Sequence, residues 1–405
     1  MPFRLALSGL NAASQDLTVT ANNVANVATT GFKGSRAEFA DLFATTQQGV
    51  SATAIGNGVR VSNVSQQFAQ GNIDFTDNSL DLAISGQGFF ILNDAGALTY
   101  TRAGAFQVNN QGYVVNAKQQ RLQVYPPLPT GGFNTGGLAD LSLTTNISAP
   151  QATTDVGLVL NLPANATAPA AATFDPADQA SYNHTTSLTI YDSLGAAHTA
   201  SMYFVKTATP NAWETHLYID GAAAGGPEPL EYTDGGVLVT PAGGEITFPA
   251  YTPSTGAANL NLTFDFGNTS QFGQNFTVNA TPQNGFTTGR LIGIDIDSSG
   301  IVQARFTNGR SNPLGQIAMA TFANPQGLQQ LGDTAWAETY ASGQALIGEA
   351  GNSGFGLVQA GALEASNVDI TEQLVNMITA QRNFQANAQM ISTADSITQT
   401  IINIR

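Results

Sequence analysis

The chain has 405 residues, of which 42% are hydrophobic and only 10% are charged, and its formal net charge is −15 at pH 7. This length and apolar content allow a sizeable buried core and predict two or three domains. The acidic balance and the lack of any basic run argue against nucleic acid as a partner. The absence of cysteine excludes a disulfide framework and a thiolate metal site.

The first thirty residues carry an apolar stripe with helical spacing. Its members step by four and three, and they are Phe3, Leu7, Leu10, Ser14, Leu17, Ala21, Val24 and Ala28. The apolar run after Arg4 is too short for a signal peptide, and no long apolar stretch predicts a membrane span. We therefore predict an N-terminal helix over residues 1–30 and no insertion into a membrane.

Residues 31–71 differ in composition from the helix before them. They are rich in Gly, Ser, Thr and Gln, and the sequence GFKG at its start breaks the helix. Short strand patterns separated by turn residues then fill residues 72–145 and return in 285–363, with GFFIL, LTYTR and IVQARF as examples. We predict an extended connector over 31–71 and one β domain built from the two later segments.

Residues 146–284 predict a second, outer β domain. Between residues 122 and 289, one lysine stands against twelve acidic residues, so this region carries −11 of the total charge of −15. One strand alternates clearly, and its core-facing residues would be Trp213, Thr215, Leu217 and Ile219. An acidic domain looped out from the middle of a chain is most simply the part that faces solvent.

No motif in the chain supplies a catalytic or cofactor site. Gly86-Gln87-Gly88 has Ile91 where the third glycine of a dinucleotide fingerprint would stand. Residues 295–300 imitate the start of a calcium loop, but Phe306 occupies the position of the bidentate glutamate. The chain has three histidines, His184, His198 and His216, which could in principle bind zinc. Polar positions on strands account for them more simply. We predict that the protein is not an enzyme and has no cofactor or metal.

The last forty residues carry a second helical stripe. Its members are Ile370, Leu374, Met377, Gln381, Phe384, Ala388, Ile391, Ala394, Ile397, Ile401 and Ile404. Asn367 or Asp369 can accept hydrogen bonds from the first turn of this helix. The two terminal stripes match, so we predict that the terminal helices pack on each other. A hairpin within one chain and an interface between chains both remain open.

Several stretches resemble the signatures of bacterial flagellar rod and hook axial proteins. The N-terminal stretch is ANNVANVATTGFK, and the C-terminal stretch is GALEASNVD, followed by LVNMI and AQRNFQ. DLAISGQGFF and YTRAG resemble the β domain of that family, while YDSLG with YFVK and LGQI with FAN resemble its hook branch. The resemblance covers nearly the whole chain and is weakest in residues 125–180 and 220–260.

The resemblance implies a multidomain fold of α plus mostly β structure with nested domains. Its parts would be a helical coiled-coil domain at the inner wall of a tube (1–30 with 364–405), a connector (31–71), a first β domain (72–145 with 285–363) and an outer acidic β domain (146–284).

The resemblance also implies a structural subunit that polymerises helically into the flagellar hook, a flexible joint that passes motor torque from rod to filament. Its partners would be further copies of itself, the rod at the base, hook–filament junction proteins and the hook cap at the tip, and the flagellar type III export apparatus. The subunit would be extracellular and exported without a cleaved signal peptide. The alternatives are a distal rod subunit of the same family and a secreted β-rich carbohydrate-binding protein or enzyme.

Two sets of residues would carry assembly in this interpretation. The helix seams are Phe3, Leu7, Leu10, Leu17, Val24, Ile370, Leu374, Met377, Phe384, Ile391, Ile397, Ile401 and Ile404. The signature and connector residues, which come from the resemblance, are Asn22, Asn23, Asn26, Gly31, Phe32, Lys33, Asn367 and Arg382.

Overall fold

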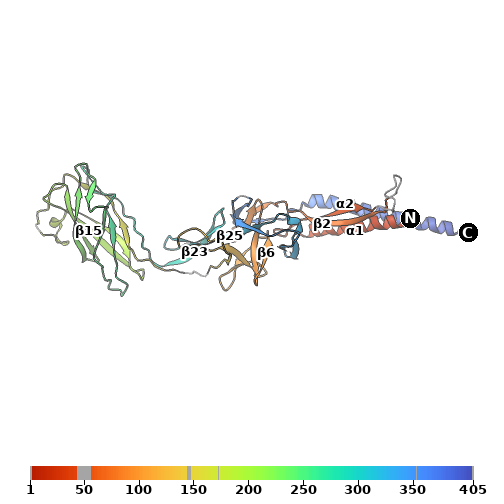
Figure 1. The fold of residues 1–405 in the computed structure, drawn as a ribbon, viewed down its shortest axis with the longest axis horizontal. Helices are drawn as coiled ribbons and strands as arrows, with labels where there is room; N and C mark the ends of the chain where they lie inside the picture. Colours follow the sequence, from red (N-terminus) through yellow and green to blue (C-terminus); the bar gives the residue numbers. More distant parts are fainter. Residues whose placement is uncertain (1, 43–55, 144–146, 172, 353, 404–405) are drawn as a thin grey trace. The chain divides into compact units, whose positions relative to one another are not determined.

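The computed structural model describes residues 2–42, 56–143, 147–171, 173–352 and 354–403. The chain folds as two compact units, which are drawn in Figure 1. The first unit contains residues 1–144, 293–305 and 311–405, and the second contains residues 145–292 and 306–310. The second unit therefore includes 285–292 and 306–310, which the sequence-based boundaries assign to the first β domain.

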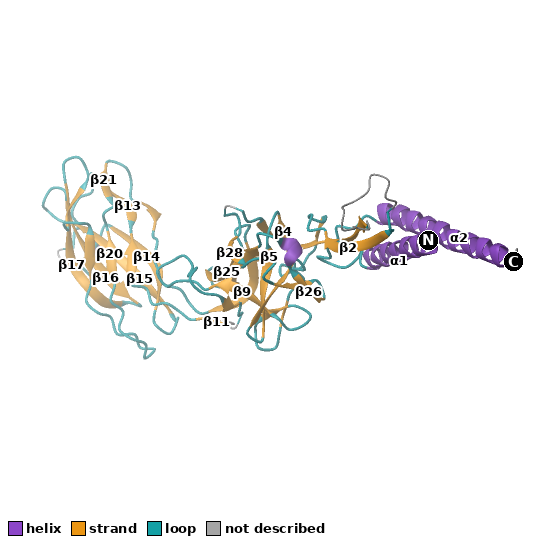
Figure 2. Ribbon diagram, turned by 45° about the vertical axis from the view of Figure 1, so that its right-hand side comes forward, coloured by secondary structure: helices purple, strands orange, loops and turns teal. Residues whose placement is uncertain are grey.

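Two antiparallel helices of the first unit lie side by side, α1 (Pro2–Ala25) and α2 (Ile370–Asn403). Near one end of the pair, the Asn23 side-chain amide donates to Gln373 Oε1 at 3.1 Å, and near the other end Gly9 lies against Asn387. Figure 2 shows both helices, with α2 extending past the start of α1. Neither helix has the length and apolar content that crossing a membrane requires, within the residues described.

A seam of small residues lies between the two helices. Gly9 and Asn23 contact α2, and residues with the same helical spacing on that face are also buried, namely Ala6, Ala13 and Thr20. Ala380 is fully buried on α2, one heptad from Gln373 and one from Asn387. A Cβ on Gly9 would lie 2.5 Å from Asn387 Oδ1. Small side chains therefore allow the helices to approach closely.

This seam corrects the expectation that the large N-terminal stripe packs against α2. Phe3 and Leu7 are 51% and 42% exposed. The predicted stripe already included small members such as Ser14 and Ala21, but the residue whose close contact with α2 requires a small side chain is Gly9.

The start of α2 follows one of the two predicted caps. Asp369 Oδ1 accepts hydrogen bonds from the backbone N–H groups of Thr371 (2.7 Å) and Glu372 (3.1 Å). Asn367 bonds to other segments instead.

The region after α1 forms a β ribbon and not the predicted extended connector. Strands β1 (Ser35–Asp41) and β2 (Val59–Gln66) pair antiparallel, with an irregularity between Glu38 and Phe39. The ribbon contacts α1, where the Val59 N–H donates to Ser8 Oγ at 3.3 Å. Residues 43–55 of the predicted connector lie outside the described residues.

The β part of the first unit contains a mixed set of short and long strands. They are β3 (Ile73–Phe75), β4 (Leu82–Ser85), β5 (Phe89–Asp94), β6 (Ala97–Thr101), β7 (Gln107–Val108), β8 (Val114–Val115), β9 (Arg121–Tyr125), β10 (Ala139–Asp140), β24 (Ile301–Phe306), β25 (Ser311–Thr321), β26 (Gln329–Gly332), β27 (Ala335–Ala337), β28 (Leu346–Glu349), β29 (Leu357–Ala360) and β30 (Ala362–Glu364). The main sheet has the order β24-β25-β9-β5-β6-β27-β26. β23 (Gly289–Ile296) crosses the boundary between the units.

This sheet is buried on both faces. Phe90 and Leu92 of β5 belong to one hydrophobic core, and Phe89 and Ile91 of the same strand belong to another. Because successive side chains of a strand point to opposite faces, the continuous apolar run GFFIL requires cover on both sides.

The second unit is a β structure with a single main core. Its strands are β11 (Ile147–Ser148), β12 (Asp155–Gly157), β13 (Val159–Pro163), β14 (His184–Tyr191), β15 (Ala197–Lys206), β16 (Ala212–Ile219), β17 (Ala222–Tyr232), β18 (Leu238–Thr240), β19 (Glu245–Thr247), β20 (Thr263–Asp265), β21 (Ser270–Phe272) and β22 (Thr277–Ala280). β14 to β18 form one sheet in chain order. The predicted alternation in β16 is confirmed, since its four core-facing residues are buried: Trp213, Thr215, Leu217 and Ile219.

Asp16 occupies the seam of small residues, at the heptad position between Gly9 and Asn23. Burial raises the pKa of its carboxyl, so protonation stabilises the packed helices, and their stability falls as the pH rises through the Asp16 pKa. We expect Asp16→Asn to raise the thermal midpoint of the helices near pH 7, as measured by far-ultraviolet circular dichroism. The gain should vanish below about pH 4, where the wild-type carboxyl is protonated.

The matched control is Asp395→Asn, because Asp395 is exposed on α2. Equal shifts for the two variants would contradict the placement of Asp16 in the seam.

Candidate assembly site at the junction of the chain ends

Three charged side chains meet in the interior of the first unit, next to the point where both terminal helices join the β structure. Lys33 Nζ lies 2.6 Å from Glu364 Oε1, and Arg102 Nη1 lies 3.1 Å from Glu364 Oε2. The Lys33 and Glu364 side chains are fully buried, and Arg102 is 5% exposed. We call these three residues the junction cluster.

The junction cluster connects segments that lie far apart in the sequence. Lys33 follows the turn after α1, Arg102 follows β6, and Glu364 ends β30. Further hydrogen bonds reach the backbone: Lys33 Nζ to Ala69 O (2.8 Å), Gly71 N to Glu364 Oε1 (2.9 Å) and Arg102 Nη2 to Gly86 O (2.8 Å). One carboxylate therefore holds both chain ends to the β structure.

The cluster places two cations against one anion in a dehydrated environment. Burial lowers the pKa of the Lys33 ammonium, and the nearby Glu364 carboxylate opposes that shift. Burial likewise lowers the pKa of the Arg102 guanidinium, again opposed by Glu364. The single anion is thus essential, because two buried cations would otherwise lack any compensating charge.

Two asparagine side chains form hydrogen bonds to the backbone around the cluster. Asn23 Oδ1 accepts from Ser35 N (2.8 Å), and its Nδ2 donates to Ser35 O (2.7 Å). Asn367 Oδ1 accepts from Gly34 N (2.8 Å), and its Nδ2 donates to Gln67 O (2.6 Å) and Ala69 O (3.0 Å). Because each amide uses both its donor and its acceptor, either asparagine can align two chain segments at once.

The end of α1 is closed by a third group of polar side chains. Asn26 Nδ2 donates to Asn22 O (2.9 Å) and Asn22 Oδ1 (3.1 Å), and Thr29 Oγ1 donates to Asn26 Oδ1 (3.2 Å). Phe32 is half-buried beside them, whereas Arg382 is exposed on α2. Arg382 is therefore the one predicted signature residue whose side chain lies away from the junction, on the helix surface.

Gly31 occupies a position that other residues fit poorly. Its φ is +69°, and its N–H donates to Glu364 O at 2.7 Å. A Cβ there would lie 2.5 Å from Ala103 N. Both the left-handed backbone and the close approach favour glycine.

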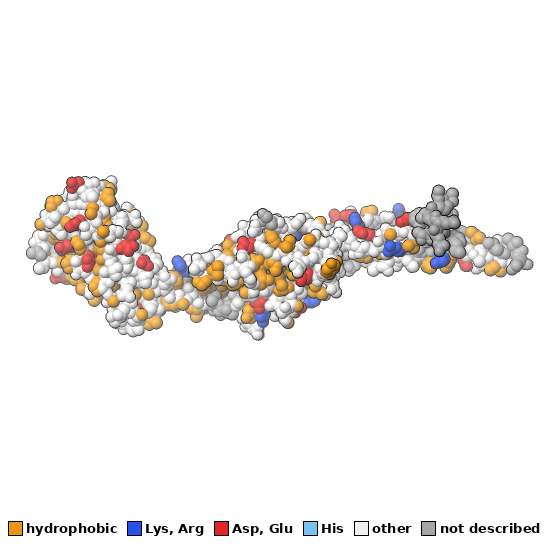
Figure 3. Space-filling view, viewed as in Figure 1, with side chains coloured by type: hydrophobic (Ala, Val, Ile, Leu, Met, Phe, Trp, Pro, Cys, Tyr) orange, Lys and Arg blue, Asp and Glu red, His pale blue; other side chains and the backbone are white. Residues whose placement is uncertain are grey.

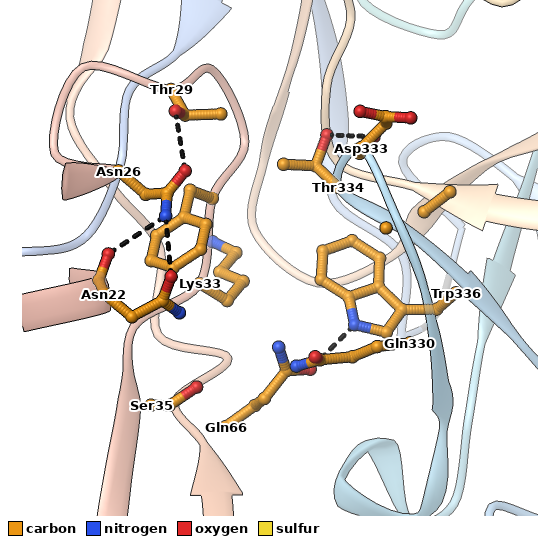
Figure 4. A pocket seen from close by; sticks show the side chains of 13 residues that line it. Asn22, Asn26, Thr29, Lys33, Ser35, Gln66, Gln330, Asp333, Thr334 and Trp336 are labelled. Atoms are coloured by element: carbon orange, nitrogen blue, oxygen red, sulfur yellow. Dashed lines mark hydrogen bonds between the residues drawn. The ribbon is translucent and has the colours of Figure 1, made fainter. Parts of the chain in front are cut away.

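A pocket of about 350 Å³ lies beside the junction cluster. Figure 4 shows the α1 residues Asn22 and Asn26 on one side, with Trp336 and Thr334 on the other. The Trp336 indole N–H donates to Gln66 Oε1 at 2.7 Å. The lining consists mainly of amides, hydroxyls and one indole, so it offers hydrogen bonds and apolar contact and no nucleophile–base pair.

The predicted seam residues fall into two classes in the structure. Five are exposed: Phe3 (51%), Leu7 (42%), Ile370 (48%), Leu374 (46%) and Ile397 (56%). Six are half-buried: Leu10, Leu17, Val24, Met377, Phe384 and Ile391. The side chain of Ile401 and the whole of Ile404 lie outside the described residues. Four more exposed apolar residues of α2 were missed by the stripe, namely Val375, Ile378, Met390 and Ile402.

The sequence-based list of site residues missed Arg102 and Glu364. Both stand inside stretches that carry the resemblance, YTRAG and GALEASNVD. A usable signal was present, because charged residues are scarce in this chain and those inside apolar motifs need partners.

The three histidines lie in the second unit and do not come together. His184 stacks on Phe276 and His216 stacks on Phe174, with ring centroids 4.5 and 4.0 Å apart, respectively. Over the described residues, no group of three side chains has the arrangement of a metal site.

Comparison with known families gives matches along most of the chain. Residues 3–33 match the flagella basal body rod protein family, and residues 359–404 match the flagellar basal body rod FlgEFG protein C-terminal family. Residues 83–160 match the flagellar hook protein FlgE/F/G D1 domain, and residues 161–286 match the flagellar basal body protein FlaE D2 domain.

Curated relatives and a solved structure are similar over long stretches. The chain is 40% identical to the flagellar hook protein FlgE of Salmonella typhimurium and 39% identical to that of Escherichia coli, covering 100% of both chains in each comparison. It is 32% identical to that of Borreliella burgdorferi over 98% of both chains. The crystal structure of Helicobacter pylori flagellar hook protein FlgE2 covers 72% of this chain and 100% of its own, with a TM-score of 0.54 at 14% identity, which indicates a shared fold.

Replacing the single anion of the junction cluster tests its role. We expect Glu364→Gln to destabilise the first unit by about 3–5 kcal/mol, because it leaves two buried cations without a counter-charge. Urea unfolding followed by Trp336 fluorescence measures this, in a Trp213→Phe background that removes the tryptophan of the second unit. The control is Glu38→Gln, which breaks the exposed Arg36–Glu38 pair and should cost far less, because solvent screens an exposed pair. Similar losses for both variants would contradict the prediction.

Substitution of Gly31 separates steric collision from backbone strain. Gly332 also has a positive φ (+84°), but nothing lies within 4 Å of a Cβ placed there. We expect Gly332→Ala to show only the backbone cost, about 1–2 kcal/mol, and Gly31→Ala to exceed it by roughly 1–3 kcal/mol because of overpacking. The same Trp336 unfolding assay compares them, and equal costs would refute the close contact with Ala103.

Proposed function

Because this chain belongs to the flagellar hook protein FlgE family and is a structural subunit of the flagellar hook, we propose that its copies assemble through the exposed apolar faces of α1 and α2. The single observation that carries this proposal is the apolar surface left uncovered on both helices. A helix usually buries its apolar stripe, and uncovered apolar patches typically mark interaction sites.

The division of each helix into two faces supports the proposal. Small residues face the partner helix within the chain, so the larger apolar residues remain free for neighbouring copies. On α2, Ile370, Leu374 and Ile378 recur every four residues and share one side of the helix. Contacts of this kind between different surfaces do not close on themselves, and they generate helical tubes. The terminal helices would then form a coiled-coil inner wall, with the β domains nested outside it.

The surface of the β structure is suited to a joint that bends. Figure 3 shows that polar, uncharged surface predominates on the face drawn, with few charged side chains. Contacts between such surfaces, partly through water, can be exchanged at low cost when neighbouring subunits shift. The glycine-containing turn after α1 and the β1–β2 ribbon would take up part of the remaining strain.

Subunits at the two ends of the tube would contact other proteins of the flagellum. We expect the lower end to contact the rod and the upper end to contact hook–filament junction proteins and the hook cap. The subunit would reach that extracellular position through the flagellar type III export apparatus.

A single charge on the exposed face of α2 tests the assembly proposal. We expect Leu374→Asp to leave the monomer folded, because Leu374 is 46% exposed, and to abolish tubes seen by electron microscopy. Burying the new carboxylate in an apolar contact without a partner disfavours assembly strongly. Each 1.4 kcal/mol lost raises the concentration needed for assembly about tenfold.

Asn383→Asp is the matched control, since it adds the same charge at an exposed position two and a half turns along α2, on the opposite side. We expect this variant to assemble. Tubes of Leu374→Asp at the wild-type concentration would show that this face does not mediate assembly.

A further inference from the structure

The second unit contains a histidine held between two carboxylates. His198 Nδ1 lies 2.6 Å from Asp220 Oδ2, and His198 Nε2 lies 3.3 Å from Asp192 Oδ2. His198 and Asp192 are buried, whereas the Asp220 side chain is 43% exposed. Thr255 Oγ1 also donates to Asp192 Oδ2 at 2.7 Å. We call these four residues the His198 clamp.

The clamp joins three loops of the second unit. Asp192 belongs to the β14–β15 turn, where its Oδ1 accepts from Leu194 N (2.9 Å) and Ala196 N (2.8 Å). Asp220 belongs to the β16–β17 turn, and Thr255 belongs to the loop between β19 and β20. Without the clamp, these loops would share fewer contacts.

The β14–β15 turn also contacts the segments by which the chain enters and leaves the second unit. A Cβ on Gly195 would lie 2.9 Å from Pro150 and 3.3 Å from Thr288 N. Next to the turn, Thr153 N donates to Tyr191 O, and Tyr191 N donates to Thr153 Oγ1, both at 2.9 Å. Order in this turn is thus coupled to order in the entering and leaving segments.

Only the protonated histidine can satisfy both carboxylates. A neutral imidazole donates through one ring nitrogen and presents a lone pair at the other, whereas an imidazolium donates through both. The only other titratable group shown facing the ring is Tyr251, whose ring centroid lies 6.2 Å away, and no Lys or Arg is shown in contact with it among the described residues.

We propose that the His198 clamp is a pH-sensitive switch, which holds the β14–β15 turn in place while His198 is protonated and releases it when His198 loses its proton. This inference rests on the second unit alone and does not depend on the assembly proposal.

The direction of the pH effect follows from the surroundings of each group. Burial opposes protonation of His198, but the hydrogen bonds and charges of Asp220 and Asp192 prevail and raise its pKa. The stabilisation is therefore complete below about pH 6.5, the ordinary value for histidine, and is lost as the pH rises through the raised pKa. Although burial again opposes it, hydrogen bonds lower the pKa of Asp192 to about 2, so its contribution is lost only in acid.

The test uses the full chain and its three histidines. NMR of selectively labelled histidine should show His198 titrating above the ordinary histidine pKa, while burial lowers the pKa of His184 and His216. Amide hydrogen exchange of Leu194 and Ala196, corrected for intrinsic rates, should accelerate up to tenfold for each pH unit between the ordinary and the raised His198 pKa. A His198 midpoint at or below the ordinary value overturns the proposal.

Two variants distinguish a switch from a merely structural ion cluster. We expect Asp220→Asn to lower the His198 midpoint and to lower by the same amount the pH at which the acceleration of exchange ends, so that the total acceleration becomes smaller. His184→Gln is the control, because His184 contacts Phe276 and should leave both readouts unchanged. If His198 titrates as expected but exchange of Leu194 and Ala196 does not follow it, the clamp is no switch and the proposal fails.

Discussion

The buried Glu364 carboxylate is the interaction on which the arrangement of the first unit depends. It pairs with Lys33 after the first helix, with Arg102 in the β structure, and with the Gly71 N–H, while its own backbone oxygen accepts from Gly31. A carboxylate removed from water requires this full set of donors. Because the donors come from three segments, the two terminal helices and the β structure are positioned together.

That constraint explains how one chain can be well packed internally and still leave apolar surface exposed for other copies. The junction fixes where α1 ends and where α2 begins, and the small residues between the helices let them approach closely. Several large apolar residues are then left on outer faces, where they would contact other copies in the proposed assembly. In the proposed assembly, residue size would separate internal packing from contacts between copies on the same two helices.

Much of this could be predicted from the sequence. The two helices, the turns of the β structure, the alternation in β16 and the Asp369 cap follow from local periodicity and turn chemistry. The β1–β2 ribbon was missed because Gly, Ser, Thr and Gln dominate the segment around its two strands, and because its pairing joins residues far apart in the sequence. The small-residue seam was missed because a stripe chosen by hydrophobicity overlooks Gly9, Ala13 and Ala380. The pairing of Glu364 with Arg102 could not be predicted either, because only the tertiary fold brings these two residues together.

The most direct test of the central claim is a double-mutant cycle between Lys33 and Glu364. The free energy of unfolding of the first unit would be measured from Trp336 fluorescence for Lys33→Met, Glu364→Gln and the double variant. If one carboxylate joins the chain ends to the β structure, the two losses are strongly non-additive, with a coupling above about 1 kcal/mol. Additive losses, within about 0.5 kcal/mol, would contradict the account.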